Sequence, residues 1–277
     1  MNNIHGLWQQ AKHACKKQKS VSLMLLYFQA RRAERSFYLD ESEFLLQSLS
    51  AKRVHMLVVN SIHYVFLAQI CINSFLRHNP QFNFVIHTDS RLAQTLRRRF
   101  KFLIKFNRVE VIEDLDQELT WQRSKLGVIL AMNGTEDVFM DADLRWNGLL
   151  TETMGITFYL REFSLGGSGL YTRAFPKYGL TPDHHMYNLS FFTFGGNAFS
   201  VSEIDEVFSL QQEIEQLDSE SLTPADILAI RRMSEQLALS IAVCRFSESV
   251  NTLKSVDQRN DGDFVESCYF GATGLTF

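Results

Sequence analysis

Residues 138–143 read Val-Phe-Met-Asp-Ala-Asp, an apolar run that ends in two carboxylates separated by one residue. The apolar part is typical of a short buried strand, and side chains alternate between the two faces of a strand. On that geometry Asp141 and Asp143 point to the same side, where both reach one hard cation such as Mg2+ or Mn2+. Two aspartates after a strand also suit a turn or a helix cap. The stretch predicts either a metal site or a turn at the end of a strand.

The chain before this stretch alternates between strand-like and helix-like patterns. Short apolar runs, typical of strands buried on both faces, are separated by segments with helical spacing of apolar residues. The expected strands are 55–59, 82–87, 108–112 and 137–140, and the expected helices are 64–76, 92–104 and 121–132. This alternation predicts an α/β domain with a mainly parallel sheet, in which ligands bind at the carboxyl ends of the strands.

The second half of the chain is less regular. Residues 164–183 contain four glycines and two prolines, which predicts a long loop, and loops of that length commonly carry recognition. Beyond the loop we expect a strand at 191–194, helices at about 201–217 and 224–243, and a last strand at 264–270.

Composition and charge narrow the class of protein. The 277 residues are 45% hydrophobic and 21% charged, which excludes disordered and fibrous classes. The net charge is −3, yet residues 1–35 are strongly basic. This segment would pack on the main domain, contact an anionic membrane surface or meet an acidic partner. A second basic cluster, between residues 97 and 108, suits a solvated helix end or an anionic ligand. No wider pattern supports a nucleic-acid partner.

Cysteine spacing and hydropathy indicate the compartment. Cys15, Cys71, Cys244 and Cys268 lie far apart without a C-x-x-C motif, so neither a disulfide framework nor a zinc site is expected. The apolar run 21–28 is too short to span a bilayer and lacks a cleavage site. We therefore expect a cytoplasmic protein, with peripheral membrane contact through residues 1–35 as an option. We divide it into a helical extension, residues 1–50, and one α/β domain, residues 51–277.

Several short blocks, in the same order, resemble glycosyltransferase family 8, the glycogenin-like enzymes, over about residues 53–271. The blocks are Leu57-Val58-Val59-Asn60 with Tyr64, Ser124-Lys125-Leu126, residues 138–143, Tyr187-Asn188-Leu189-Ser190-Phe191-Phe192, and Ser234-Glu235-Gln236. The resemblance implies a GT-A fold, a Rossmann-like α/β architecture. It also implies a metal-dependent enzyme that transfers a sugar from a nucleotide-sugar donor, expected to be a UDP-sugar, with retention of configuration. The acceptor, whether glycan, lipid-linked or protein, stays open.

The resemblance also assigns roles to residues. It implies that Asn60 and Tyr64 lie at the nucleotide base and that Lys125 contacts the sugar nucleotide. Arg123 is a further candidate cation for the diphosphate. The expected donor-binding set is Asn60, Tyr64, Arg123, Lys125, Asp141, Ala142 and Asp143, of which Asp141 and Asp143 would bind Mn2+ or Mg2+.

The expected catalytic set is Asp183, Asn188 and Glu235. The resemblance implies that Asp183 and Asn188 face the donor sugar. Asp183 also suits a turn after Pro182. An inverting reaction would need a general base, for which Asp183 and Glu235 are the candidates.

The chain departs from the family pattern near its C-terminus. The family's H-x-x-G-x-x-K supplies a third metal ligand and a lysine, whereas residues 268–274 read Cys-Tyr-Phe-Gly-Ala-Thr-Gly. His184 or His185 is a candidate substitute. Two other functions stay open: a nucleotidyltransferase with the same carboxylates, and a degenerate domain that binds a sugar nucleotide or a partner. The first is weakened because no glycine-rich phosphate loop follows the first strand.

Overall fold

A computed structural model describes residues 52–116, 119–146, 148–150, 155–162, 174–178, 186–218, 220, 222–247, 249–253 and 265–267, the last range and residues 160–162 as backbone alone. The helical extension 1–50 and residues Asp183, His184, His185 and Cys268 lie outside this part. The described residues fall into two compact units. Unit 1 lies within residues 1–114, 141–151 and 261–277, and unit 2 within 115–140 and 152–260.

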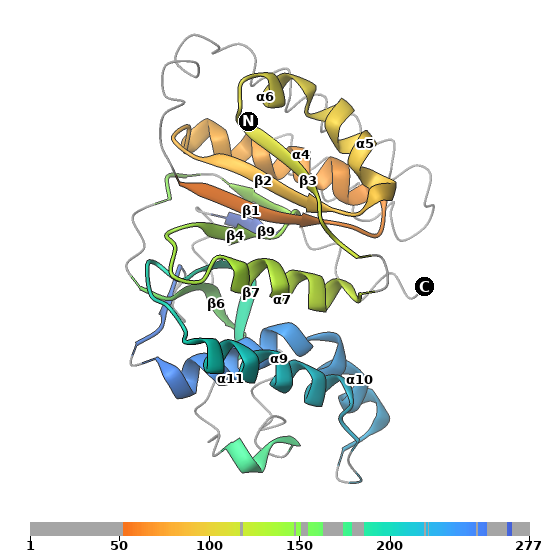
Figure 1. Ribbon diagram of the computed structural model, residues 1–277, viewed down its shortest axis with the longest axis vertical. Coiled ribbons are helices and arrows are strands. Elements are labelled where there is room, and N and C mark those ends of the chain that lie inside the picture. Colours follow the sequence, from red (N-terminus) through yellow and green to blue (C-terminus); the bar gives the residue numbers. More distant parts are fainter. Residues whose placement is uncertain are drawn as a thin grey trace. The chain divides into compact units, whose positions relative to one another are not determined.

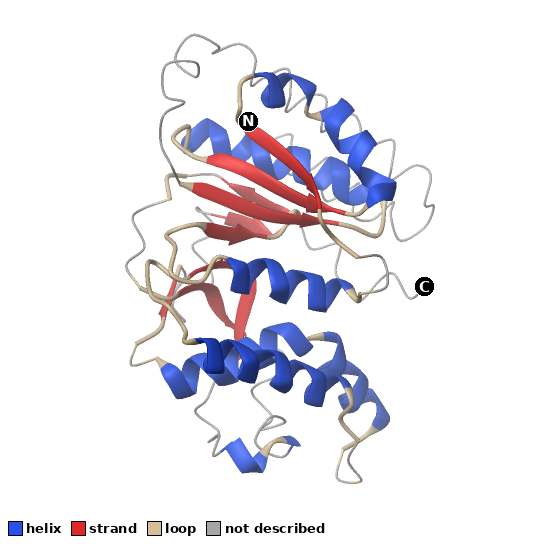
Figure 2. Ribbon diagram, in the orientation of Figure 1, coloured by secondary structure: helices blue, strands red, loops and turns tan. Residues whose placement is uncertain are grey.

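Unit 1 is built on parallel strands in the order β3-β2-β1 (Figures 1 and 2). The strands are β1 (Arg53–Val58), β2 (Asn83–Thr88) and β3 (Val109–Glu113), with α4 (Ile62–His78), α5 (Ser90–Arg99) and α6 (Lys101–Lys105). On α4, Phe75 packs edge-to-face on Phe84 of β2 and on Trp146. A second, antiparallel pair joins β5 (Leu144–Trp146) to β9 (Val265–Ser267).

Unit 2 contains the strands β4-β7-β6-β8 in that order, with antiparallel β4/β7 and β6/β7 pairs and a parallel β6/β8 pair. The strands are β4 (Val138–Met140), β6 (Thr157–Glu162), β7 (Met186–Thr193) and β8 (Asn251–Thr252). The helices are α7 (Trp121–Ala131), α9 (Val201–Glu215), α10 (Pro224–Arg232) and α11 (Ser234–Phe246), with a short 3-10 helix, η3 (Pro176–Tyr178). Helix α11 packs on β7, α7 and α9.

The predicted α/β class and the alternation of strands and helices are confirmed. Two expected helices are each divided, because Phe100 separates α5 from α6 and Met233 separates α10 from α11. Strands β5, β6 and β8 were not expected, and β7 begins five residues earlier than the predicted strand 191–194. No helix in the described part of the chain combines the length and apolarity needed to cross a bilayer.

Candidate functional site

The two aspartates follow β4 directly, as predicted, but they lie in a turn. Strand β4 ends at Met140, and the Leu144 N–H donates to the carbonyl of Asp141 at 3.4 Å. Ala142 is buried, whereas Asp141 and Asp143 are half-buried. Both carboxylates are thus partly exposed on either side of a buried residue. The strand alternation used to place them on one side does not apply, since the backbone turns here.

Helix α4 holds the aspartate segment within unit 1. The thiol of Cys71 donates to the carbonyl of Asp141 with an S···O distance of 3.7 Å. Further along, the Trp146 N–H donates to the hydroxyl of Ser74 at 3.0 Å, and the side chain of Asn79 bonds backbone groups beyond Trp146. The segment after β4 therefore runs beside α4, in the same direction as the helix.

The start of α4 carries two residues of the expected donor-binding set. Asn60 has a left-handed φ of 72°, and the hydroxyl of Ser61 caps the first turn of the helix. Tyr64 lies in that turn and is 40% exposed. Seven residues separate Tyr64 from Cys71, so both lie on one face of α4, about 10.5 Å apart along its axis. The face of α4 that bonds Asp141 thus also carries Tyr64, two turns closer to the N-terminus.

The two candidate cations lie on α7 in unit 2, in different surroundings. Arg123 forms an ion pair with Glu215 of α9, with N···O distances of 2.6 and 2.8 Å. Lys125 is only 5% exposed, and its Nζ lies 5.3 Å from the ring centroid of Phe139. A cation over an aromatic face is stabilised by the ring quadrupole. Lys125 is therefore held in place within unit 2, while Arg123 would have to leave Glu215 to bind a ligand.

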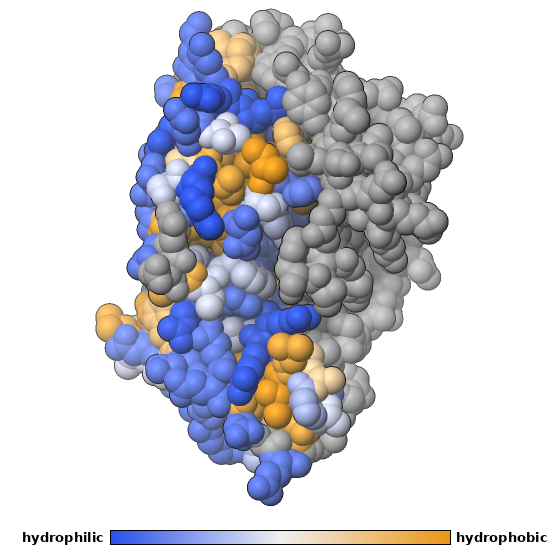
Figure 3. Space-filling model, turned by 90° about the vertical axis from the view of Figure 1, so that its right-hand side faces the viewer, coloured by the Kyte–Doolittle hydropathy of each residue, from blue (hydrophilic) through white to orange (hydrophobic). Residues whose placement is uncertain are grey.

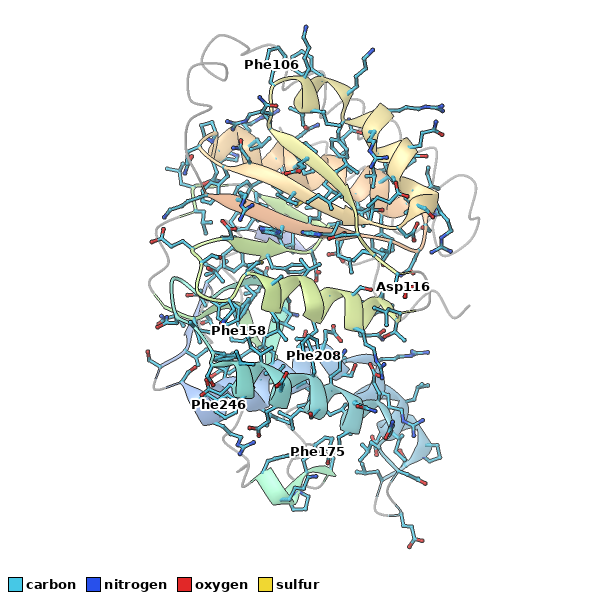
Figure 4. All side chains as sticks on the ribbon, viewed as in Figure 1. Phe106, Asp116, Phe158, Phe175, Phe208 and Phe246 are labelled. Atoms are coloured by element: carbon cyan, nitrogen blue, oxygen red, sulfur yellow. The ribbon has the colours of Figure 1, made fainter. Side chains whose placement is uncertain are left out.

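Strand β7 is irregular at Asn188. Between the pairs Phe158–Phe192 and Leu160–Asn188, β7 has two more residues than β6; Phe158, which flanks this shift, is labelled in Figure 4. Asn188 is 4% exposed, and its Oδ1 accepts the N–H of Ser190 at 2.8 Å. Bulges of this kind redirect side chains and are frequent next to active sites.

Helix α11 supplies hydrogen bonds to this irregular part of β7. The Leu189 N–H donates to Gln236 Oε1 at 3.2 Å, and the Tyr187 N–H donates to Ser240 Oγ at 2.9 Å. Glu235, in the first turn of α11, is 3% exposed. A carboxylate there is favoured by the positive end of the helix dipole. The structure thus brings the segments of two expected catalytic residues, Asn188 and Glu235, together within unit 2.

Gln236 was not in the expected set, although it stands in the Ser-Glu-Gln block. Its side chain is 5% exposed, and its Nε2 has no hydrogen-bond acceptor among the described residues. A buried amide donor without a partner is rare in proteins. We therefore add Gln236 to the candidate residues of unit 2. The sequence block pointed to it, but only the contact with β7 shows how it is held.

A polar chain across unit 1, formed by two buried histidines and an exposed aspartate, was not predicted from the sequence. His55 Nδ1 lies 2.9 Å from His87 Nε2, and His87 Nδ1 lies 2.7 Å from Asp114 Oδ2. An ionised Asp114 accepts a hydrogen bond from His87 Nδ1–H, so the neutral His87 accepts one from His55 at Nε2. The residues are far apart in sequence. Only the parallel pairing of β1, β2 and β3 brings them together.

The hydrogen-bonded row of His55, His87 and Asp114 makes the stability of the fold dependent on pH. Burial lowers the pKa of His87 below 6.5, and this outweighs the opposing effect of Asp114. The unfolded chain then binds more protons, so the contribution of His87 is complete above pH 6.5 and is lost as the pH falls toward the folded-state pKa. We expect urea unfolding at pH 5 to 8 to show a smaller fall toward low pH in His87→Gln than in the wild type.

A histidine elsewhere serves as the control. His78, at the C-terminal end of α4, is less buried, although burial and Arg77 also lower its pKa. His78→Gln should change the pH profile less than His87→Gln does. Identical profiles for His87→Gln and the wild type would contradict the role given to His87.

The chain is similar to known proteins in its fold. No family model and no curated protein matches the chain. Solved structures that are similar to it include the glycosyltransferase GlyE of Streptococcus pneumoniae, with a TM-score of 0.47, 12% identity and coverage of 76% of this chain and 47% of that one. The chain thus spans about half the length of GlyE.

Two further structures are similar over most of both chains. The PaToxG glycosyltransferase has a TM-score of 0.40 and 13% identity, with 80% of each chain covered. Mouse xyloside xylosyltransferase 1 has a TM-score of 0.43 and 11% identity, with 73% of this chain and 85% of that one covered. All three structures are of glycosyltransferases.

Proposed function

We propose that the chain is a metal-dependent glycosyltransferase of the GT-A type, which transfers a sugar from a UDP-sugar to an acceptor hydroxyl. The observation that carries the proposal is the arrangement along α4 in unit 1. One face of this helix bears Tyr64, and two turns further on it bonds the backbone of Asp141. An exposed aromatic ring and the backbone of the aspartate segment thus lie along one helix.

This arrangement suits a nucleoside diphosphate. A base can stack on the ring of Tyr64, since stacking of a base on an aromatic side chain contributes about 1–3 kcal/mol. The ribose then leads toward the carboxylates, where the diphosphate would lie. The left-handed turn at Asn60 directs the chain into α4, which places an exposed amide side chain just before the helix. Asn60 and Tyr64 are accordingly proposed to bind the nucleoside.

The aspartates fit a hard cation. Asp141 and Asp143 supply carboxylate oxygens, and no group of three or more His, Cys, Asp or Glu side chains suited to a metal occurs in the described residues. Magnesium and manganese are commonly held by one or two carboxylates together with substrate phosphates. When bound, such an ion neutralises charge on the departing diphosphate. Two protein ligands suffice for this role, so Asp141 and Asp143 match it.

The remaining assignments rest on the family resemblance and on the chemistry of each residue. Lys125 and Arg123 would add positive charge for the diphosphate. Asn188 and Asp183 would bind the donor sugar. A retaining reaction needs no strong side-chain base, whereas Glu235 would be the base of an inverting one. The bulge at Asn188 and the buried side chains of Glu235 and Gln236 support a binding role for this part of unit 2.

A thermal-shift series tests the function. UDP, GDP and CMP are each added to the full chain with manganese, with magnesium or with a chelator. We expect UDP with metal to raise the Tm, since a ligand at 100 times its Kd adds about 2.7 kcal/mol to the stability of the folded state. UDP with chelator should have little effect. An assay for release of UDP from a UDP-sugar then distinguishes an enzyme from a domain that binds the sugar nucleotide without turnover.

Two variants of Tyr64 sharpen the series. Tyr64→Phe keeps the aromatic face and should keep the shift by UDP, whereas Tyr64→Ala should lose most of it. Equal shifts in the two variants would show that the ring of Tyr64 does not bind the nucleotide.

The alternative function has its own readout. Release of pyrophosphate from a nucleoside triphosphate would favour a nucleotidyltransferase over a glycosyltransferase.

A further inference from the structure

The junction of α5 and α6 presents cations on its outer face. In α6, Leu103 is buried, and Lys101 and Lys105 are four residues apart on the opposite side of the helix. Both lysines are exposed, as is Arg98 in the last turn of α5. With Phe102 and Phe106 they form what we call the basic-aromatic corner. This corner lies in unit 1, away from the aspartate segment in the sequence.

Within the described part of the chain, the charges of the corner are not neutralised by neighbouring carboxylates. The neighbouring Arg97 is paired with Glu113, with an N···O distance of 3.4 Å, and Arg99 donates to the amide oxygen of Gln69 at 2.5 Å. In the described ranges, no carboxylate lies within ion-pair distance of the three cations of the corner. Such a surface attracts an anionic partner.

The aromatic part of the corner is only partly covered. Phe102 and Phe106 are half-buried, and their rings meet edge-to-face at a centroid distance of 4.8 Å. The Nζ of Lys105 lies 5.8 Å from the ring centroid of Phe106. Figure 4 labels Phe106 beside α6, and Figure 3 shows hydrophilic residues next to apolar ones on the described surface. Lys105 and the two rings therefore share one small surface.

We propose that the basic-aromatic corner binds an anionic membrane surface. Lysine and arginine side chains near such a surface are attracted by its negative potential, and phenylalanine rings can enter the boundary between headgroups and acyl chains. A purely acidic protein would use the cations but not the rings. A single-stranded nucleic acid would need open ring faces for stacking, whereas these two rings pack on one another. The inference does not depend on the proposed nucleotide site.

Site-specific quenching tests this inference on the full chain. A tryptophan is placed in the corner by Phe106→Trp, and the control Phe208→Trp places one on α9, where Phe208 is 42% exposed. Vesicles of phosphatidylcholine, with or without phosphatidylglycerol, contain a lipid-borne quencher. We expect the added emission of Phe106→Trp, relative to the wild type, to be quenched by the anionic vesicles alone. The added emission of Phe208→Trp should not be quenched.

Charge removal gives a second readout that does not need tryptophan. Lys101→Gln with Lys105→Gln should weaken co-sedimentation with the anionic vesicles roughly 25-fold, because each charge contributes about a factor of five. Arg231→Gln with Arg232→Gln removes the same charge from α10 and should leave vesicle binding unchanged. Equal binding by the two double variants, or binding without quenching at position 106, would overturn the proposal. Binding to polyglutamate or an oligonucleotide in place of vesicles would also overturn it.

Discussion

Asp141→Asn is expected to abolish the metal-dependent stabilisation by UDP and the transfer activity while leaving the fold intact. The substitution removes one charged oxygen ligand, and even changes outside the ligands themselves cost 10- to 100-fold at metal sites, so a loss on the order of 100-fold or more is expected. The hydrogen bonds of Asp141 to Cys71 and Leu144 use its backbone carbonyl and survive. Titration with UDP and manganese, followed by thermal shift, measures the effect.

A matched substitution separates the metal site from a general effect of charge. Asp205, exposed on α9, carries the same charge, and Asp205→Asn should bind UDP and metal as the wild type does. Asp143→Asn should resemble Asp141→Asn. If Asp141→Asn kept the full shift by UDP, Asp141 would be the turn residue that the sequence also allowed, and the proposed function would lose its metal site.

The sequence predicted the order of strands and helices well where a single periodicity decides. The run before Asp141 is apolar because β4 is buried throughout, and α4 was visible from its long helical spacing. The first and last residues of the helices and strands were harder to predict. Helix α10 begins with Thr223 and Asp226 in a capping box, which is a local signal, but its end at Met233 has no proline or glycine to mark it.

Features that depend on pairing between distant segments could not be predicted. His55, His87 and Asp114 each look ordinary in the sequence, and they meet only through the register of three parallel strands. The bulge of β7 likewise depends on its partner strand and on side chains of α11, among them Gln236. The local sequence thus predicted where the aspartates lie in the chain, while these polar contacts between distant segments required the structure.

Gly195→Ala is expected to lower the free energy of unfolding by about 3 kcal/mol or more, the largest loss of stability that we expect from a single added methyl group. Gly195 follows β7 with a φ of 56°, and a Cβ there would lie 2.6 Å from the backbone nitrogen of Gly155. The backbone of Gly155 cannot move away from the added Cβ as a flexible side chain could. The N–H of Gly195 also donates to the hydroxyl of Thr193 at 3.0 Å. Urea unfolding followed by circular dichroism measures the loss.

The next residue distinguishes close packing from backbone strain. Gly196 also has a positive φ, 83°, but a Cβ there would meet nothing within 4 Å. Gly196→Ala should therefore cost only the strain of a left-handed residue, about 1–2 kcal/mol. Equal losses in the two variants would show that the contact with Gly155 does not matter. A larger loss in Gly195→Ala would show that this contact fixes the end of the β6/β7 pair, because Gly155 leads into β6 and Gly195 leaves β7. The same strand pair contains the bulge at Asn188, toward its other end.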